Sequence, residues 1–111
     1  MNEIKPLRSL EGRFYTDPAI YERECQTTLA KTWQYAGHVS QLKKAGDYFT
    51  FSIAGEDLFC IRTKESEINC FYNVCQHRAH QLLKGEGNSS VVVCPYHAWT
   101  YELDGRMRAG P

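Results

Sequence analysis

The chain has 111 residues, 42% of them hydrophobic and 23% charged, values typical of one folded domain with a modest core. Thirteen basic residues balance thirteen acidic residues, which argues against nucleic acid or an anionic membrane surface as a partner. No apolar run is long enough to span a bilayer, and residues 1–14 lack the apolar stretch of a secretory signal. We therefore expect a cytoplasmic protein.

The first periodic segment predicts a helix over about 17–35. Asp17 and Pro18 suit its cap and first turn, and apolar residues recur every four positions from Tyr21 to Trp33. We expect residues 1–40 to form an N-terminal arm around this helix.

Beyond residue 38 the pattern predicts short antiparallel strands. The expected strands are 48–53, 58–61, 68–72, 91–93 and 99–103. Residues 85–88 have the composition of a turn, and Asp104-Gly105 is a strong hairpin signal. The fold class that follows is mainly β, a small antiparallel domain over 41–111 that carries the helical arm.

The chain has five cysteines, an odd number, whereas a closed disulfide framework needs an even number. In a reducing compartment, clustered cysteines more often hold a metal or take part in chemistry. Cys25, Cys60 and Cys70 have no neighbouring histidine, so we expect them to be small buried or half-buried thiols.

The remaining cysteines lie in two short Cys/His motifs, Cys75-x-His77 and Cys94-x-x-His97, which residues 78–93 separate. Two thiolates and two imidazoles suit zinc or an iron–sulfur cluster better than magnesium or calcium. Zinc fingers usually pair Cys with Cys and His with His, whereas here each motif mixes them. A two-iron cluster with both cysteines on one iron and both histidines on the other fits mixed motifs. A zinc-binding structural module remains the alternative.

The motif C-x-H followed by C-P-Y-H-A-W resembles the Rieske [2Fe-2S] domain, an iron–sulfur β sandwich. The resemblance implies that Cys75 and Cys94 bind one iron of the cluster, and that His77 and His97 bind the other. The other histidines, His38 and His80, are then expected to serve the fold or the edge of the cluster.

Residues beside the ligands resemble the oxygenase-type Rieske pattern. Arg78 and Trp99 match that pattern, and together with Tyr96 they are the expected neighbours of the cluster. Ala79 and Ala98 stand where the family usually has glycine, so a position that needs positive φ would be strained there.

The resemblance also implies a low reduction potential. His80 and Tyr96 occupy the positions of the disulfide cysteines of high-potential Rieske proteins, and Trp99 replaces a serine that donates to a cluster sulfur there. Fewer donors to the sulfurs lower the potential, so we expect a value near the low end of the Rieske range, roughly −150 mV.

The arm, with its W-x-x-x-G-H ending at 33–38, resembles the start of the α subunit of Rieske non-haem iron oxygenases of the ring-hydroxylating type. The resemblance implies a reductase or ferredoxin as electron donor and a mononuclear Fe(II) in a catalytic domain that follows residue 111. That domain would belong to the same or the neighbouring subunit of a homotrimer.

The whole protein would then be a mono- or dioxygenase that hydroxylates or demethylates a quaternary amine or an aromatic ring. The present chain would carry electrons without being catalytic by itself. A self-contained ferredoxin-type electron carrier is the second alternative.

Overall fold

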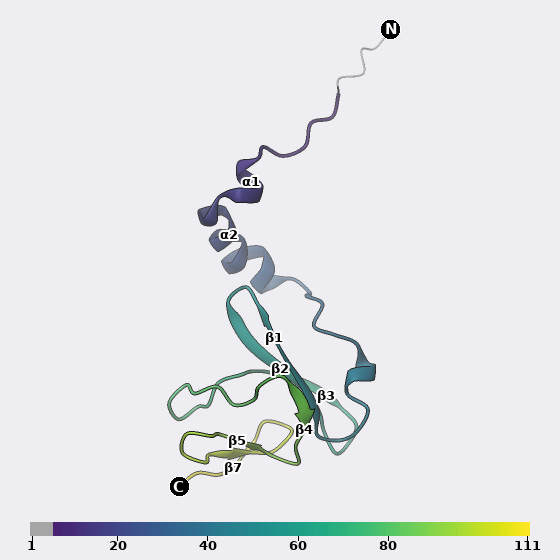
Figure 1. Cartoon of the computed structure of the whole chain (residues 1–111), viewed down its shortest axis with the longest axis vertical. Coiled ribbons are helices and arrows are strands. Elements are labelled where there is room, and N and C mark those ends of the chain that lie inside the picture. Colours follow the sequence, from purple (N-terminus) through teal and green to yellow (C-terminus); the bar gives the residue numbers. More distant parts are fainter. Residues whose placement is uncertain (1–5) are drawn as a thin grey trace. The chain divides into compact units, whose positions relative to one another are not determined.

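The computed structural model describes residues 6–111, which divide into two compact units at the bond between Trp33 and Gln34. The first unit contains the helices α1 and α2, and the second contains the strands β1 to β7 (Figure 1). No helix within the described residues is both long enough and apolar enough to cross a membrane.

The longer helix of the arm, α2, begins at the predicted cap, whereas the helix before it was not predicted. A short helix α1 (Arg13–Thr16) precedes α2 (Pro18–Glu24). Between them Asp17 has extended backbone, and its carboxylate accepts the Ala19 N–H at 2.9 Å. With Pro18 in the first turn, this is the predicted start of the helix.

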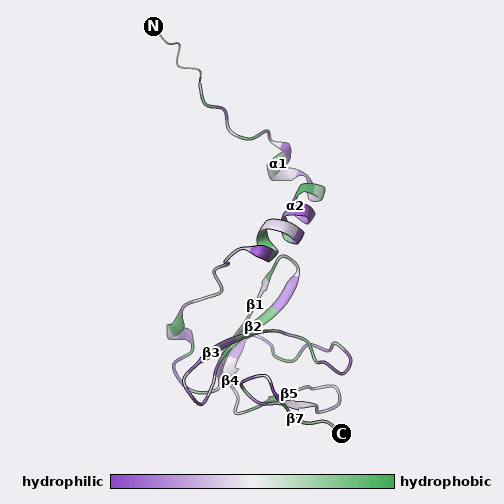
Figure 2. Cartoon of the chain, turned by 180° about the vertical axis from the view of Figure 1, so that it is seen from behind, coloured by the Kyte–Doolittle hydropathy of each residue, from purple (hydrophilic) through white to green (hydrophobic). Residues whose placement is uncertain are grey.

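The helix changes character after Glu24, where η1 (Cys25–Leu29) forms a π-helical turn, and it ends at residue 31 instead of near residue 35. The Thr27 hydroxyl donates to the Arg23 carbonyl at 2.6 Å, and such back-bonding by a β-branched residue loosens a regular α-helix. Figure 2 shows hydrophobic and hydrophilic residues mixed along this arm, and Trp33 is fully exposed.

The larger of the two sheets in the second unit is antiparallel and has four strands (Figure 1). Its order is β3-β2-β1-β4, with β1 (Asp47–Ile53), β2 (Glu56–Arg62), β3 (Ile68–Tyr72) and β4 (Glu86–Asn88). The first three strands are those predicted from the sequence.

Strand β4 corrects the prediction, because residues 86–88 pair with β1 instead of forming only a turn. The pairing depends on contacts across the chain. Asn88 Nδ2 donates to the Ala45 carbonyl at 2.9 Å and to Asp47 Oδ1 at 2.8 Å. Local composition does not reveal such long-range bonds, and a Gly-containing segment has weak strand propensity of its own.

A second, three-stranded sheet contains β5 (Val92–Val93), β6 (Thr100–Tyr101) and β7 (Met107–Ala109) in sequential order. Its strands β5 and β6 are shorter than the predicted 91–93 and 99–103. The predicted hairpin at Asp104-Gly105 is confirmed, since it joins the antiparallel strands β6 and β7.

Strand β2 has a core on each of its faces. Phe59 and Ile61 pack on one face, whereas Cys60 packs with Leu42 and Phe49 on the other. The first core is completed by Cys75, Val92, Cys94, Tyr101 and Leu103. The predicted mainly β, antiparallel fold class is therefore confirmed, and the two cysteines of the Cys/His motifs lie in its core.

Candidate metal centre

The two loops that carry the Cys/His motifs have the same backbone hydrogen-bond pattern. In each, the cysteine N–H donates to the carbonyl five residues later, and the cysteine carbonyl accepts the N–H four residues later. These bonds are Cys75 N to His80 O (2.8 Å), Ala79 N to Cys75 O (2.9 Å), Cys94 N to Trp99 O (2.8 Å) and Ala98 N to Cys94 O (3.0 Å). The loops thus present their side chains in a related way despite their different Cys–His spacing.

The tight turn of each loop contains a residue in the left-handed region. This agrees with the glycine that related domains usually have at these two positions. Ala79 has φ 55° and Ala98 has φ 60°. An L-residue with a Cβ is disfavoured in this region by roughly 1–2 kcal/mol. The sequence-based expectation of strain at these alanines is therefore confirmed.

Replacing Ala79 or Ala98 by glycine is expected to raise the free energy of unfolding by about 0.5 kcal/mol each, because relief of strain exceeds the added chain entropy. The midpoint of urea-induced unfolding measures the change. Ala109→Gly, in strand β7 with ordinary φ, is the matched control and should lower the free energy of unfolding by about 0.5 kcal/mol. Equal changes in the free energy of unfolding at all three positions would contradict the claim that Ala79 and Ala98 are strained.

The two cysteines of the motifs lie together inside the domain. Cys75 and Cys94 are 2% and 3% exposed, and both belong to the same core cluster. Burial raises the pKa of the Cys75 thiol, but the hydrogen bonds outweigh it and the net pKa is lowered. Tyr101, the backbone N–H groups of residues 77 and 78, and Cys94 supply these bonds. The site therefore favours the thiolate, which is the form that binds metal.

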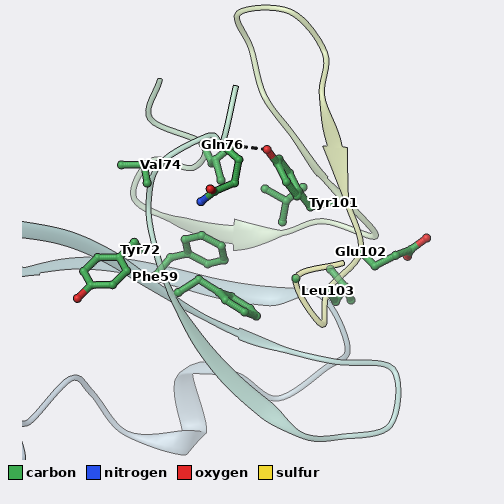
Figure 3. Close-up of a pocket in the computed structure, with 11 residues that line it drawn as sticks. Phe59, Tyr72, Val74, Gln76, Tyr101, Glu102 and Leu103 are labelled. Atoms are coloured by element: carbon green, nitrogen blue, oxygen red, sulfur yellow. Dashed lines mark hydrogen bonds between the residues drawn. The ribbon is translucent and has the colours of Figure 1, made fainter. Parts of the chain in front are cut away.

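Tyr101 is a site residue that the motif analysis missed. Its hydroxyl lies 3.3 Å from Cys75 Sγ and accepts the Gln76 N–H at 3.1 Å, the bond drawn as a dashed line in Figure 3. The same ring borders an apolar cavity of about 190 Å³. The sequence did contain a signal for this role. Tyr101 lies two residues after Trp99 on an expected strand, and alternate residues of a strand share a face.

The two histidines of the motifs lie at the surface, beside one another. The ring centroids of His77 and His97 are 5.0 Å apart, with an interplanar angle of 64°. Trp99 stacks on His77 at 4.6 Å and 6°, and Tyr96 contacts His97 at 3.9 Å and 39°. Each imidazole thus has an aromatic neighbour that restricts its orientation.

The remaining expected neighbours also gather here. The Arg78 guanidinium lies over the Tyr96 ring, 5.9 Å from its centroid, and His80 stacks on the same ring at 5.7 Å and 26°. His80 Nδ1 is also 2.7 Å from the Gln81 carbonyl. The two positions that would carry a disulfide in high-potential relatives are thus neighbours in this chain.

Asn73 is a second residue that the sequence did not single out. It is 1% exposed and lies directly after β3, two residues before Cys75. Its side chain accepts the N–H groups of Leu82 and Leu83 at 3.1 and 2.9 Å and donates to the Leu83 carbonyl at 2.8 Å. It thereby fixes the chain that leaves the first loop. A lone Asn beside a strand gives no sequence signal of such a network.

His38 lies outside this group of residues. It caps the short turn η2 (Val39–Gln41), where its Nδ1 accepts the Ser40 N–H at 3.2 Å. Its own N–H donates to Gln41 Oε1 at 2.8 Å. The expectation that His38 serves the fold agrees with these bonds.

The donors form two pairs, buried thiols and exposed imidazoles, instead of one group. Within residues 6–111 no three His, Cys, Asp or Glu side chains come close enough to hold a single metal ion. A mononuclear zinc site gathers four ligands around one ion, whereas a two-iron cluster takes two ligands on each iron. The pairs fit the second arrangement.

Two curated relatives are similar in sequence to most of this chain. The carnitine monooxygenase oxygenase subunit of Escherichia coli (strain K12) is 45% identical over 100 residues, which cover 89% of this chain and 27% of that protein. The chloroplastic choline monooxygenase of Beta vulgaris is 43% identical over 107 residues, covering 95% and 24% respectively. The chain therefore spans about a quarter of the length of these relatives.

Solved structures and a family model agree with this relationship. The apo form of the quaternary ammonium Rieske monooxygenase CntA has a TM-score of 0.87 at 42% identity, covering 92% of this chain and 30% of that chain. Naphthalene 1,2-dioxygenase from Rhodococcus sp. has a TM-score of 0.84 at 30% identity, covering 88% and 22%. The family model of the Rieske [2Fe-2S] domain matches residues 32–111. With paired Cys/His loops on two antiparallel sheets, the chain belongs to the Rieske [2Fe-2S] domain family.

Proposed function

We propose that this chain is the electron-relaying part of an oxygenase subunit that acts on a quaternary ammonium compound. The observation that carries the proposal is the pair of matching loops, with two thiols buried together and two imidazoles side by side at the surface. The family implies a Rieske [2Fe-2S] cluster as the cofactor. When bound, the cluster accepts and passes on one electron at a time.

Within this proposal, Cys75 and Cys94 bind one iron, and His77 and His97 bind the other. The chemistry of the donors fits, since the lowered pKa of the Cys75 thiol favours thiolate and soft sulfur ligands suit iron–sulfur clusters. The exposed imidazoles then form the edge through which electrons enter or leave.

Trp99, Tyr96 and Arg78 support that edge. Trp99 stacks on His77, and its buried indole Nε1–H is the one buried side-chain donor or acceptor in residues 6–111 that lacks a protein partner. Tyr96 holds His97, and Arg78 covers Tyr96. These contacts fix the imidazole planes, as outer contacts commonly do for metal ligands.

Tyr101→Phe is expected to lower the reduction potential of the loaded chain by about 40 mV, because a lost donor worth about 1 kcal/mol no longer stabilises the reduced form. A redox titration followed by absorption or electron paramagnetic resonance measures the shift. Tyr72→Phe, an exposed tyrosine on β3, is the control and should leave the potential unchanged. A shift of the same size in both variants would contradict a specific role for the Tyr101 hydroxyl.

In this proposal the whole protein has three parts. Residues 1–40 form the arm, residues 41–111 form the Rieske domain, and a catalytic domain with a mononuclear Fe(II) follows. A reductase or ferredoxin supplies electrons to this chain, and the catalytic domain of the same or the neighbouring subunit of a homotrimer receives them. One related solved structure is described as showing inter-subunit electron transfer, which supports that route.

The cytoplasmic location stays a prediction.

The substrate class rests on the relatives. Those named above act on carnitine and choline, both quaternary amines, whereas the naphthalene enzyme is less similar at 30% identity. These identities favour monooxygenation of a quaternary amine over dioxygenation of an aromatic ring.

Two measurements test the proposed function. Electron paramagnetic resonance of the reduced chain should give an average g below that of an all-cysteine cluster, and a colourless protein that contains zinc would exclude the relay. The full-length protein with a reductase should then consume carnitine, choline or a related betaine faster than naphthalene. Preference for naphthalene would overturn the substrate class but leave the relay intact.

A further inference from the structure

Two cysteines outside the metal centre face each other across the larger sheet. Cys60 of β2 and Cys70 of β3 are direct partners in the antiparallel register. Cys60 is buried and Cys70 is exposed, so the expectation of a buried or half-buried thiol is wrong for Cys70. It is wrong because β3 is an edge strand, whose outer face here is open to solvent.

The register places these cysteines at a site that suits a cross-link. Thr63 N donates to its partner Glu67 O at 2.8 Å, which makes that rung a hydrogen-bonded pair. Hydrogen-bonded and non-hydrogen-bonded rungs alternate, so Cys60 and Cys70, three rungs further, form a non-hydrogen-bonded pair. Such pairs have Cα atoms about 4.5 Å apart, within the range that a disulfide spans.

The environments of the two thiols differ, although their residues are direct neighbours across the strands. Burial, followed by the charge and the hydrogen bond of Cys70, raises the pKa of the Cys60 thiol to about 12. Cys60 therefore stays protonated at neutral pH, while exposed Cys70 meets an oxidant first.

We propose that Cys60 and Cys70 form a reversible disulfide when the protein meets a hydroperoxide. The Cys70 sulfur attacks the peroxide, the O–O bond breaks, and Cys70 sulfenic acid forms with release of water or, from an alkyl hydroperoxide, an alcohol. The Cys60 thiol then attacks the Cys70 sulfur, the S–O bond breaks, and the departing hydroxyl takes the Cys60 proton and leaves as a second water while the S–S bond forms. The peroxide takes two electrons from the sulfurs, and both thiol hydrogens end in the products. An exposed disulfide of this kind is open to reduction by a thiol.

The cross-link lies on the sheet face opposite the metal centre. The adjacent rung, Phe59 with Phe71, turns the other way, its rings 5.6 Å apart, and packs in the core that contains Cys75 and Cys94. Oxidation of Cys60 and Cys70 should therefore leave the ligands of the cluster in place.

The test treats the cluster-loaded protein with hydrogen peroxide, alkylates its free thiols under denaturing conditions and digests it with trypsin and chymotrypsin. Cleavage after residues 59, 62, 64 and 71 separates a Cys60 peptide, 60–62, from a Cys70 peptide, 65–71, that lacks Cys75. The disulfide appears as these two peptides joined. The thiol count should fall from the five of the sequence to three, and dithiothreitol should restore it.

Cys25→Ser is the matched control and should keep the joined peptides, whereas Cys70→Ser should lose them. The joined peptides in the unmodified protein test the proposal even where a variant fails to fold. Conversion of Cys70 to sulfinic acid with Cys60 still alkylatable would overturn the proposal. A cross-link from Cys70 to Cys25 or Cys75 would overturn it as well.

Discussion

Replacement of His77 or His97 by alanine is expected to abolish the histidine-ligated cluster. Each imidazole is one of only two protein ligands proposed for its iron, and the methyl group of alanine cannot bind iron in its place. The purified variant should lose the visible absorption of the cluster and its electron paramagnetic resonance signal. Electron transfer from a reductase should fall at least 100-fold with them, since a 10- to 100-fold loss is typical for an outer contact alone.

His80→Ala is the matched control for this prediction, because His80 lies in the same loop as His77 and is equally at the surface. Its ring stacks on Tyr96, and no ligand role is proposed for it. The variant should retain the spectrum of the cluster. Loss of the signal in His80→Ala with retention in His77→Ala would show that the ligand assignment is wrong.

The sequence predicts the ligand loops well because their chemistry is local. Two Cys/His motifs of fixed spacing, followed by the Trp and preceded by strands, indicate the family without any tertiary information. The left-handed turns at Ala79 and Ala98 were also foreseeable, since a family glycine marks positive φ. The residue that the family usually has at a position thus indicates the backbone conformation there, even though this chain has alanine at both positions.

What the sequence does not predict depends on contacts between distant segments. Tyr101 reaches Cys75 from strand β6, 26 positions along the chain, and β4 forms because β1 offers it an edge. The same is true of Cys70, whose exposure depends on the place of β3 at the edge of the sheet. Motif and periodicity carry no information about which strand lies beside which.

Asn73→Ala is expected to lower the free energy of unfolding by about 3 kcal/mol or more. Three part-buried backbone groups, the N–H groups of Leu82 and Leu83 and the carbonyl of Leu83, lose their buried partner together. Each unsatisfied buried group costs roughly 1–3 kcal/mol, although water that enters the space left by the amide would recover part of this. Urea-induced unfolding followed by circular dichroism measures the loss.

Asn69→Ala provides the control, because Asn69 is half-buried in strand β3, which ends just before Asn73, and its replacement should cost less than about 1 kcal/mol. Asn73→Asp separates the parts of the network, since a carboxylate still accepts from both leucine N–H groups but cannot donate to the Leu83 carbonyl. We expect it to fall between Asn73→Ala and the unmodified chain in stability. If all three variants unfold at one urea concentration, the amide does not hold the first ligand loop. The orientation of Cys75 would then depend on Tyr101 and the backbone of the loop alone.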